Sequence, residues 1–179
     1  MRDRRLRRRS RAPGAPLLAL VLFAAGCRAL APIPPGGSPG PLRLSDLAQQ
    51  GDAQRRASLR LILEGLDAEA AGAEDRGVVL YERSLGLDAT NPFAYLALAR
   101  HYAAREDAAR ALQNLDQAEV LLAAEGGYDP RLEAHLLGLR GAALASAGQW
   151  EESRALLERA RERAPIEWAD GRLSPAELR

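Results

Sequence analysis

Cys27 is the only cysteine of the chain, and it directly follows the small residues Ala24, Ala25 and Gly26 at the end of a short apolar run. A thiol can pair in a disulfide, bind a metal, act as a nucleophile or be acylated. Small residues before it are typical of a cleavage site. We therefore expect Cys27 to be modified at the N-terminus of a processed chain. An incidental cysteine beside an ordinary cleavage site is the alternative.

The residues before Cys27 have the three parts of a secretory signal. Seven arginines lie within residues 1–11, and an apolar core follows over residues 17–23. This core is about half of the ~20 apolar residues that a membrane-spanning helix needs, so we expect a removable leader. Together with Cys27, the segment resembles a bacterial lipobox, although Ala24 stands where leucine is commonest. The resemblance implies that residues 1–26 are a lipoprotein signal peptide and that the Cys27 thiol carries a diacylglyceryl group.

Removal of residues 1–26 would reverse the sign of the net charge. They contain seven of the 25 arginines and one of the 24 acidic residues, so the mature chain carries 18 basic against 23 acidic residues, about −5. Nucleic-acid binding normally needs a basic surface, so we expect no nucleic-acid partner.

Other residues offer little catalytic chemistry. His101 and His135 lack a second ligand four residues away, so the sequence predicts no metal site and no cofactor. We expect His101 to be a satisfied surface or boundary residue. Acidic and basic residues alternate over residues 151–163, which is typical of a solvated helix face. We therefore expect that the protein is not an enzyme.

The elements that would position these residues are helices. Residues 27–44 hold the cysteine and a Pro/Gly-rich stretch, which predicts an extended tether. From residue 45 apolar side chains recur at helical spacing, which predicts an all-α domain over residues 45–179. Asn91-Pro92 and Asp129-Pro130 predict helix starts, Pro165 predicts a helix end, and residues 174–177 predict a capping box.

The helix pairs repeat. Three sets of residues share the same spacing: Gly65, Gly72, Tyr81 and Ser84; Ala99, Glu106, Leu115 and Ala118; and Gly141, Gly148, Leu157 and Ala160. Gly65 and Ala99 lie 34 residues apart, the period of tetratricopeptide (TPR) repeats, whereas Ala99 and Gly141 lie 42 apart, which predicts a longer loop near residues 125–133.

Residues 58–166 resemble the TPR family, although Glu64 and Arg140 replace its usual leucines and Glu106 replaces a turn glycine. The resemblance implies antiparallel helix pairs stacked as a short TPR solenoid, with repeats at about 58–91, 92–125 and 134–167. A generic helical bundle is the alternative. We expect Trp150 and Trp168 to pack near the end of the stack.

In the TPR family the first helix of each pair lines a concave surface that binds peptides or proteins. The matching positions here are Leu59, Ile62 and Leu66; Phe93, Leu96 and Arg100; and His135, Leu139 and Ala142. Such an apolar groove suits an amphipathic helix or an extended segment, and Arg100 could take a carboxylate. Alternatively, Leu59, Ile62 and Phe93 pack against the chain's own N-terminal segment or last short helix.

The sequence therefore favours a lipid-anchored, non-catalytic adaptor that recruits a protein or peptide partner to the cell membrane. The lipoprotein resemblance implies a place in envelope assembly, for example of pili or secretion complexes. Arg28 in place of Asp after the cysteine favours the outer membrane, facing the periplasm. A small-molecule carrier or enzyme that uses the same groove and a spacer without a partner are the alternatives.

Overall fold

The computed structural model describes residues 40–126 and 129–179. The predicted signal peptide, Cys27 and most of the predicted tether lie outside these residues. Within the described residues every regular element is helical, with no strand. None of the described helices is both long and apolar enough to cross a membrane.

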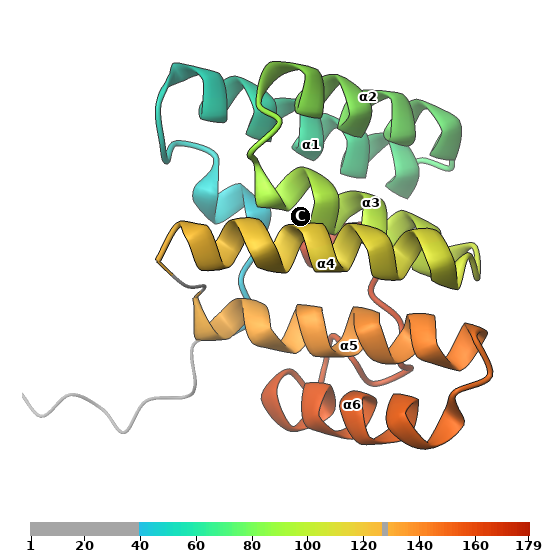
Figure 1. Cartoon of the computed structure of the whole chain (residues 1–179). Helices are drawn as coiled ribbons and strands as arrows, with labels where there is room; N and C mark the ends of the chain where they lie inside the picture. Colours follow the sequence, from blue (N-terminus) through green and yellow to red (C-terminus); the bar gives the residue numbers. More distant parts are fainter. Residues whose placement is uncertain (1–39, 127–128) are drawn as a thin grey trace, which may run out of the picture. The chain divides into compact units, whose positions relative to one another are not determined.

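Six of the helices form three adjacent pairs (Figure 1). The pairs are α1 (Ala53–Ala70) with α2 (Glu74–Leu87), α3 (Pro92–Ala104) with α4 (Ala108–Ala124), and α5 (Pro130–Ser146) with α6 (Trp150–Arg163). A short 3-10 helix, η1 (Leu44–Leu47), precedes them, and α7 (Pro175–Leu178) follows. Each pair contacts the next through α2 with α3 and α4 with α5. The prediction of an all-α, TPR-like stack of helix pairs is confirmed.

The predicted helix ends follow from local hydrogen bonds. The Asn91 side chain accepts a hydrogen bond from the Phe93 backbone N–H at 3.1 Å, and Asp129 accepts one from the Arg131 backbone N–H at 2.9 Å. The residue after each cap is a proline, which lacks an N–H and fits the first helical turn. The capping box around Ser174 opens α7. Residue types alone therefore indicated where these helices begin.

Small residues allow the two helices of a pair to approach closely. A Cβ atom at Gly141 would lie 2.9 Å from Leu157 Cγ and 3.1 Å from the Ser153 carbonyl oxygen. At Gly65 the ring of Tyr81 occupies the equivalent space. Any larger side chain would force the pair apart, because packed interiors leave no room for an extra methyl group. The repeating glycines thus reflect contact between helices.

Most of the extra residues between Ala99 and Gly141 lengthen helices instead of forming the longer loop that was predicted, so that prediction was wrong. α4 has 17 residues against 14 in α2 and α6, and α5 has 17 against 13 in α3. Residues 130–133 already belong to α5. Adding residues to a helix that remains packed on its partner satisfies their backbone groups, which a loop would leave to solvent.

The departures from the family pattern have local explanations. Glu64 and Arg140 point away from the core and form ion pairs, with Arg76 at 2.8 Å and with Asp116 at 2.7 Å. Glu106 occupies the turn between α3 and α4 with a positive φ of 60°, where the matching turns use Gly72 and Gly148. A side chain in this left-handed conformation costs about 1 kcal/mol or more.

Candidate functional site

Most of the predicted groove is filled by the ends of the chain itself. Leu59, Ile62, Leu66 and Leu96 are buried in one core cluster, which also contains Leu42, Leu44 and Leu47 from the N-terminal segment and Trp168, Leu173 and Leu178 from the C-terminal segment. Ser45 N–H donates to the Arg179 carbonyl oxygen at 2.8 Å, which ties the two segments together. α7 packs on α1, so the C-terminal segment runs from the third pair back to the first. These four groove positions present no surface to a partner.

His135, a predicted polar feature of the groove, also contacts another segment of the same chain. Its side chain is 0% exposed, and Nε2 lies 3.1 Å from the Leu42 carbonyl oxygen, so Nε2–H donates this hydrogen bond. Nδ1 has no partner among the described residues, and the Trp168 ring lies 6.5 Å away. Burial lowers the pKa of His135 below its ordinary value. The histidine is therefore a neutral donor that holds the N-terminal segment in place.

Arg100 is part of a buried cluster that sequence reasoning missed. Its guanidinium donates to Glu69 of α1, whose carboxylate also accepts the Tyr81 hydroxyl at 2.6 Å and contacts His101 Nδ1. Burial opposes ionisation of Glu69, but the His101 hydrogen bond and the Arg100 charge outweigh it, so the Glu69 pKa lies below its usual range. Burial and the Glu69 hydrogen bond raise the pKa of Tyr81.

This cluster ties α1, α2 and α3 together and uses Arg100 internally. Arg100 presents its aliphatic stem to the groove, while its charge faces Glu69. His101, expected at the surface or boundary, is satisfied but buried, with 5% exposure. No spacing signal could have found the cluster, because its members come from three helices.

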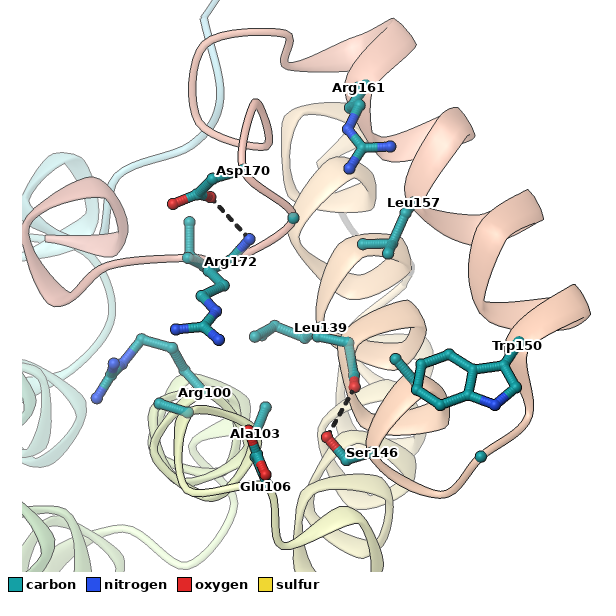
Figure 2. A pocket seen from close by; sticks show the side chains of 16 residues that line it. Arg100, Ala103, Glu106, Leu139, Ser146, Trp150, Leu157, Arg161, Asp170 and Arg172 are labelled. Carbon is teal, nitrogen blue, oxygen red and sulfur yellow. Dashed lines mark hydrogen bonds between the residues drawn. The ribbon is translucent and has the colours of Figure 1, made fainter.

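An open cavity of about 480 Å³ lies beside the filled part of the groove (Figure 2). Its floor is formed by Ala103 of α3 and by Leu139 and Ala142 of α5, with Leu157 of α6 beside them. Arg100 completes this side, so Arg100, Leu139 and Ala142 are the predicted groove residues that line the cavity. The C-terminal segment over residues 170–173 closes the opposite side.

Trp150 lines the same cavity at the start of α6 (Figure 2). It is 65% exposed, so the prediction that Trp150 packs in the stack was wrong. Trp168 is 0% exposed, and the same prediction for Trp168 was correct. Trp150 is the first residue of α6 and faces the open cavity, which leaves its indole exposed.

Leu59 and Phe93 border a second hollow, of about 550 Å³, at the start of α1. Arg55 crosses it and joins the connections between the pairs, with Nε 2.5 Å from Asp88 and Nη1 2.8 Å from Glu125. Burial opposes ionisation of Asp88, but its hydrogen bonds with Arg55 and Thr90 hold the Asp88 pKa below its usual range. Arg55 therefore links two connections between helix pairs, and its role at this hollow is structural.

The open cavity is lined by both apolar and charged side chains. Its described lining residues include no histidine, cysteine or tyrosine; Arg161 and Arg172 stand on the side of the C-terminal segment, and Glu106 and Asp170 supply carboxylates. The described residues also contain no cluster of His, Cys, Asp or Glu able to hold a metal ion. Such a lining can bind an apolar group and orient a charged one.

Comparison with solved structures identifies a similar fold. The N-terminal domain of stress-induced protein-1 (STI-1) from C. elegans, a TPR-type domain, matches with a TM-score of 0.54 and 20% sequence identity, over 72% of this chain and 98% of that one. No protein-family model matches the chain, and no curated protein matches it in sequence. The similarity shows that the fold is that of a TPR-like helical repeat.

Proposed function

We propose that this chain is a non-catalytic interaction adaptor that binds a segment of a partner protein in the cavity between α3, α5 and the C-terminal segment. The observation that carries the proposal is Trp150, an indole that is 65% exposed and lies at a cavity of about 480 Å³ with an apolar floor. Exposed aromatic side chains beside apolar pockets are frequent binding hot spots. Helical repeat stacks generally serve as protein-binding scaffolds.

The proposal includes a lipid anchor at Cys27, which would hold the adaptor at the cell membrane, on the outer membrane facing the periplasm. The lipobox-like sequence and the Pro/Gly-rich residues after it support this part. Two or more acyl chains would make attachment stable, whereas one chain gives marginal binding. A role in the assembly of envelope complexes follows from this location.

The geometry of the described part suits an anchored adaptor. The N-terminal segment meets α5 at its first turn, where Leu42 N–H donates to the Arg131 carbonyl oxygen at 3.5 Å. On α5 the cavity begins at Leu139 and reaches Ser146, the last residue of the helix. Arg131 and Leu139 lie eight residues apart, about 12 Å along the helix at 1.5 Å per residue. The cavity would therefore stay accessible while the other end is tethered.

The test is crosslinking in membranes of the producing cell, followed by capture of the full-length protein. Trp150→Ala removes the exposed indole, and Ala142→Trp fills the cavity. Val120→Ala is the matched control, because Val120 is a 63% exposed apolar residue on α4 that does not line the cavity. We expect the same partner to be lost from both cavity variants and kept by the control. A partner that is retained by both cavity variants would contradict the proposed site.

The anchor has a separate test. We expect the natural protein to incorporate labelled palmitate and its mature N-terminus to be residue 27, and we expect Cys27→Ser to lose both properties. Palmitate incorporation into Cys27→Ser, or a different mature N-terminus, would remove the anchor from the proposal without affecting the cavity.

A small-molecule carrier is the second candidate, since a volume of about 480 Å³ also falls in the range of small-molecule pockets. Native mass spectrometry of the purified protein distinguishes the two candidates. A bound metabolite that Ala142→Trp displaces would favour the carrier, whereas a protein partner lost on the same substitution favours the adaptor.

A further inference from the structure

The charged residues around the cavity differ in whether they form an ion pair. Arg100 is neutralised by Glu69, as described above. Arg161 and Arg172, on the side of the C-terminal segment, have no carboxylate within ion-pair distance among the described residues. Two guanidinium groups without an anionic partner therefore lie at one cavity.

Asp170, the acidic lining residue on that side, is engaged by the backbone. Asp170 Oδ1 accepts the Arg172 backbone N–H at 2.9 Å (Figure 2), which turns the carboxylate onto the chain. Arg161 is held in place because its Nε–H donates to the Trp168 carbonyl oxygen at 3.0 Å. Its remaining N–H groups have no acceptor among the residues that the structure describes, and Arg172 extends from the segment toward the cavity (Figure 2). Glu106 lies on the turn after α3, so the positive charge is concentrated at the C-terminal segment.

Between these arginines and Trp150 lies the apolar floor formed by Ala103, Leu139 and Ala142, with Leu157 beside it. Small side chains at Ala142 and Ala145 leave room for an inserted apolar side chain. A ligand that fits has two parts: an apolar group over this floor and an anionic group beside it, toward the arginines. Arginine is the side chain best suited to hold a carboxylate through paired N–H donors.

We infer that the partner presents a short acidic segment, in which an Asp or Glu stands next to or near an aliphatic or aromatic residue. The apolar side chain occupies the floor below Trp150, and the carboxylate is bound by Arg172. This inference rests on the proposed function, since it requires that the same cavity bind the partner.

The experiment selects binders from a random heptapeptide library displayed on phage, with the immobilised full-length protein as bait. We expect the selected peptides to place Asp or Glu near an aliphatic or aromatic residue. Replacing that acidic residue by its amide should weaken binding about five- to tenfold. Binding should also weaken as salt rises, because the arginines are partly exposed.

Variants of the protein test whether Arg172 binds the acidic residue of the peptide. Arg172 is exposed, and its side chain makes no hydrogen bond to any described residue, so Arg172→Gln should leave the fold intact. It should weaken binding of the acidic peptide by a similar factor. Arg172→Gln should have no further effect on the amide peptide. Arg154→Gln on the outer face of α6 is the control for general charge effects, and it should bind the acidic peptide as the natural protein does.

The outcomes separate the two claims. Selected peptides that lack acidic residues but lose binding in Trp150→Ala and Ala142→Trp would overturn the acidic segment and leave the proposed site standing. An equal loss in Arg172→Gln and Arg154→Gln would also overturn the acidic segment. Peptides that bind both cavity variants normally, or a library that yields no binder, would count against the site and with it the inference.

Discussion

Replacing Gly138 by alanine should destabilise the protein, although the same change in most helices stabilises them. Gly138 lies in the middle of α5, and a Cβ atom there would overlap the indole of Trp168. Trp168 is fully buried, so its ring cannot move without losing contacts with the core. This single methyl group therefore tests whether the C-terminal segment fills the concave face.

The magnitude follows from two opposing terms. Alanine in place of glycine in a helix interior gains about 0.5–1 kcal/mol. Overpacking of a core costs about 1–3 kcal/mol, and loss of a buried tryptophan side chain costs about 3–5 kcal/mol. Because the overlap is with the ring itself, the overpacking cost should lie near its upper limit of about 3 kcal/mol, which leaves a net loss of about 2 kcal/mol from the free energy of unfolding. Gly86→Ala is the matched control, since a Cβ there meets nothing within 4 Å.

The assay is urea unfolding followed by circular dichroism and by tryptophan fluorescence in a Trp150→Phe background, which leaves Trp168 as the reporter. We expect Gly138→Ala to lower the midpoint and shift the native Trp168 emission to the red, while Gly86→Ala leaves the midpoint unchanged or higher. In a Trp168→Leu background Gly138→Ala should lose its cost. If Gly138→Ala is as stable as Gly86→Ala, Trp168 does not lie on Gly138 and the filled groove is refuted.

Four further substitutions test local features. Glu106→Gly should raise the free energy of unfolding by about 1 kcal/mol, because it relieves a positive φ of 60°, and Gly148→Ala, at a φ of 78°, should lower it by a similar amount in urea titrations. His135 has a folded-state pKa below its unfolded value, so below about pH 6.5 the unfolded state takes up the proton and stability falls by up to 1.36 kcal/mol per pH unit until the folded pKa is reached. His135→Gln should flatten that part of a pH series of thermal melts. Glu69→Gln should cost about 3 kcal/mol, because it leaves the buried Arg100 charge unpaired, and calorimetry would detect the lower melting temperature.

Each of these has a contrary result. If neither Glu106→Gly nor Gly148→Ala changed the free energy of unfolding, the positive φ at these turns would carry no strain. A pH profile unchanged by His135→Gln would place the imidazole in water. A Glu69→Gln protein as stable as the natural one would mean that the cluster is not buried as an ion pair.

Features that depend on neighbouring residues were predictable. Asn91, Asp129 and Ser174 cap helices through hydrogen bonds to backbone groups two or three residues away, so residue types alone identify them. The spacing of small residues such as Gly65 and Gly141 also survives in the sequence, because helix contacts recur with the repeat. The stack of helix pairs followed from these signals.

Features that depend on distant segments were not predictable. Trp150 and Trp168 are the same residue type, yet one is exposed at a cavity and the other is fully buried. Their difference depends on where the C-terminal segment turns back, and the spacing of residues along the sequence does not indicate that position. Leu42 and His135 are joined by a hydrogen bond across 93 residues, and Glu69 collects donors from two other helices.

The sequence by itself determined the helical repeat and its caps, and it supplies the grounds for expecting an export leader and a modified Cys27, because these depend on residue types at short separations. Only the tertiary structure decided which groove positions are open. Burial of Leu42, Leu44 and Trp168 removes apolar surface from water, so the chain's own ends cover most of the concave face. What remains is the cavity beside Trp150, with Arg161 and Arg172 along its edge.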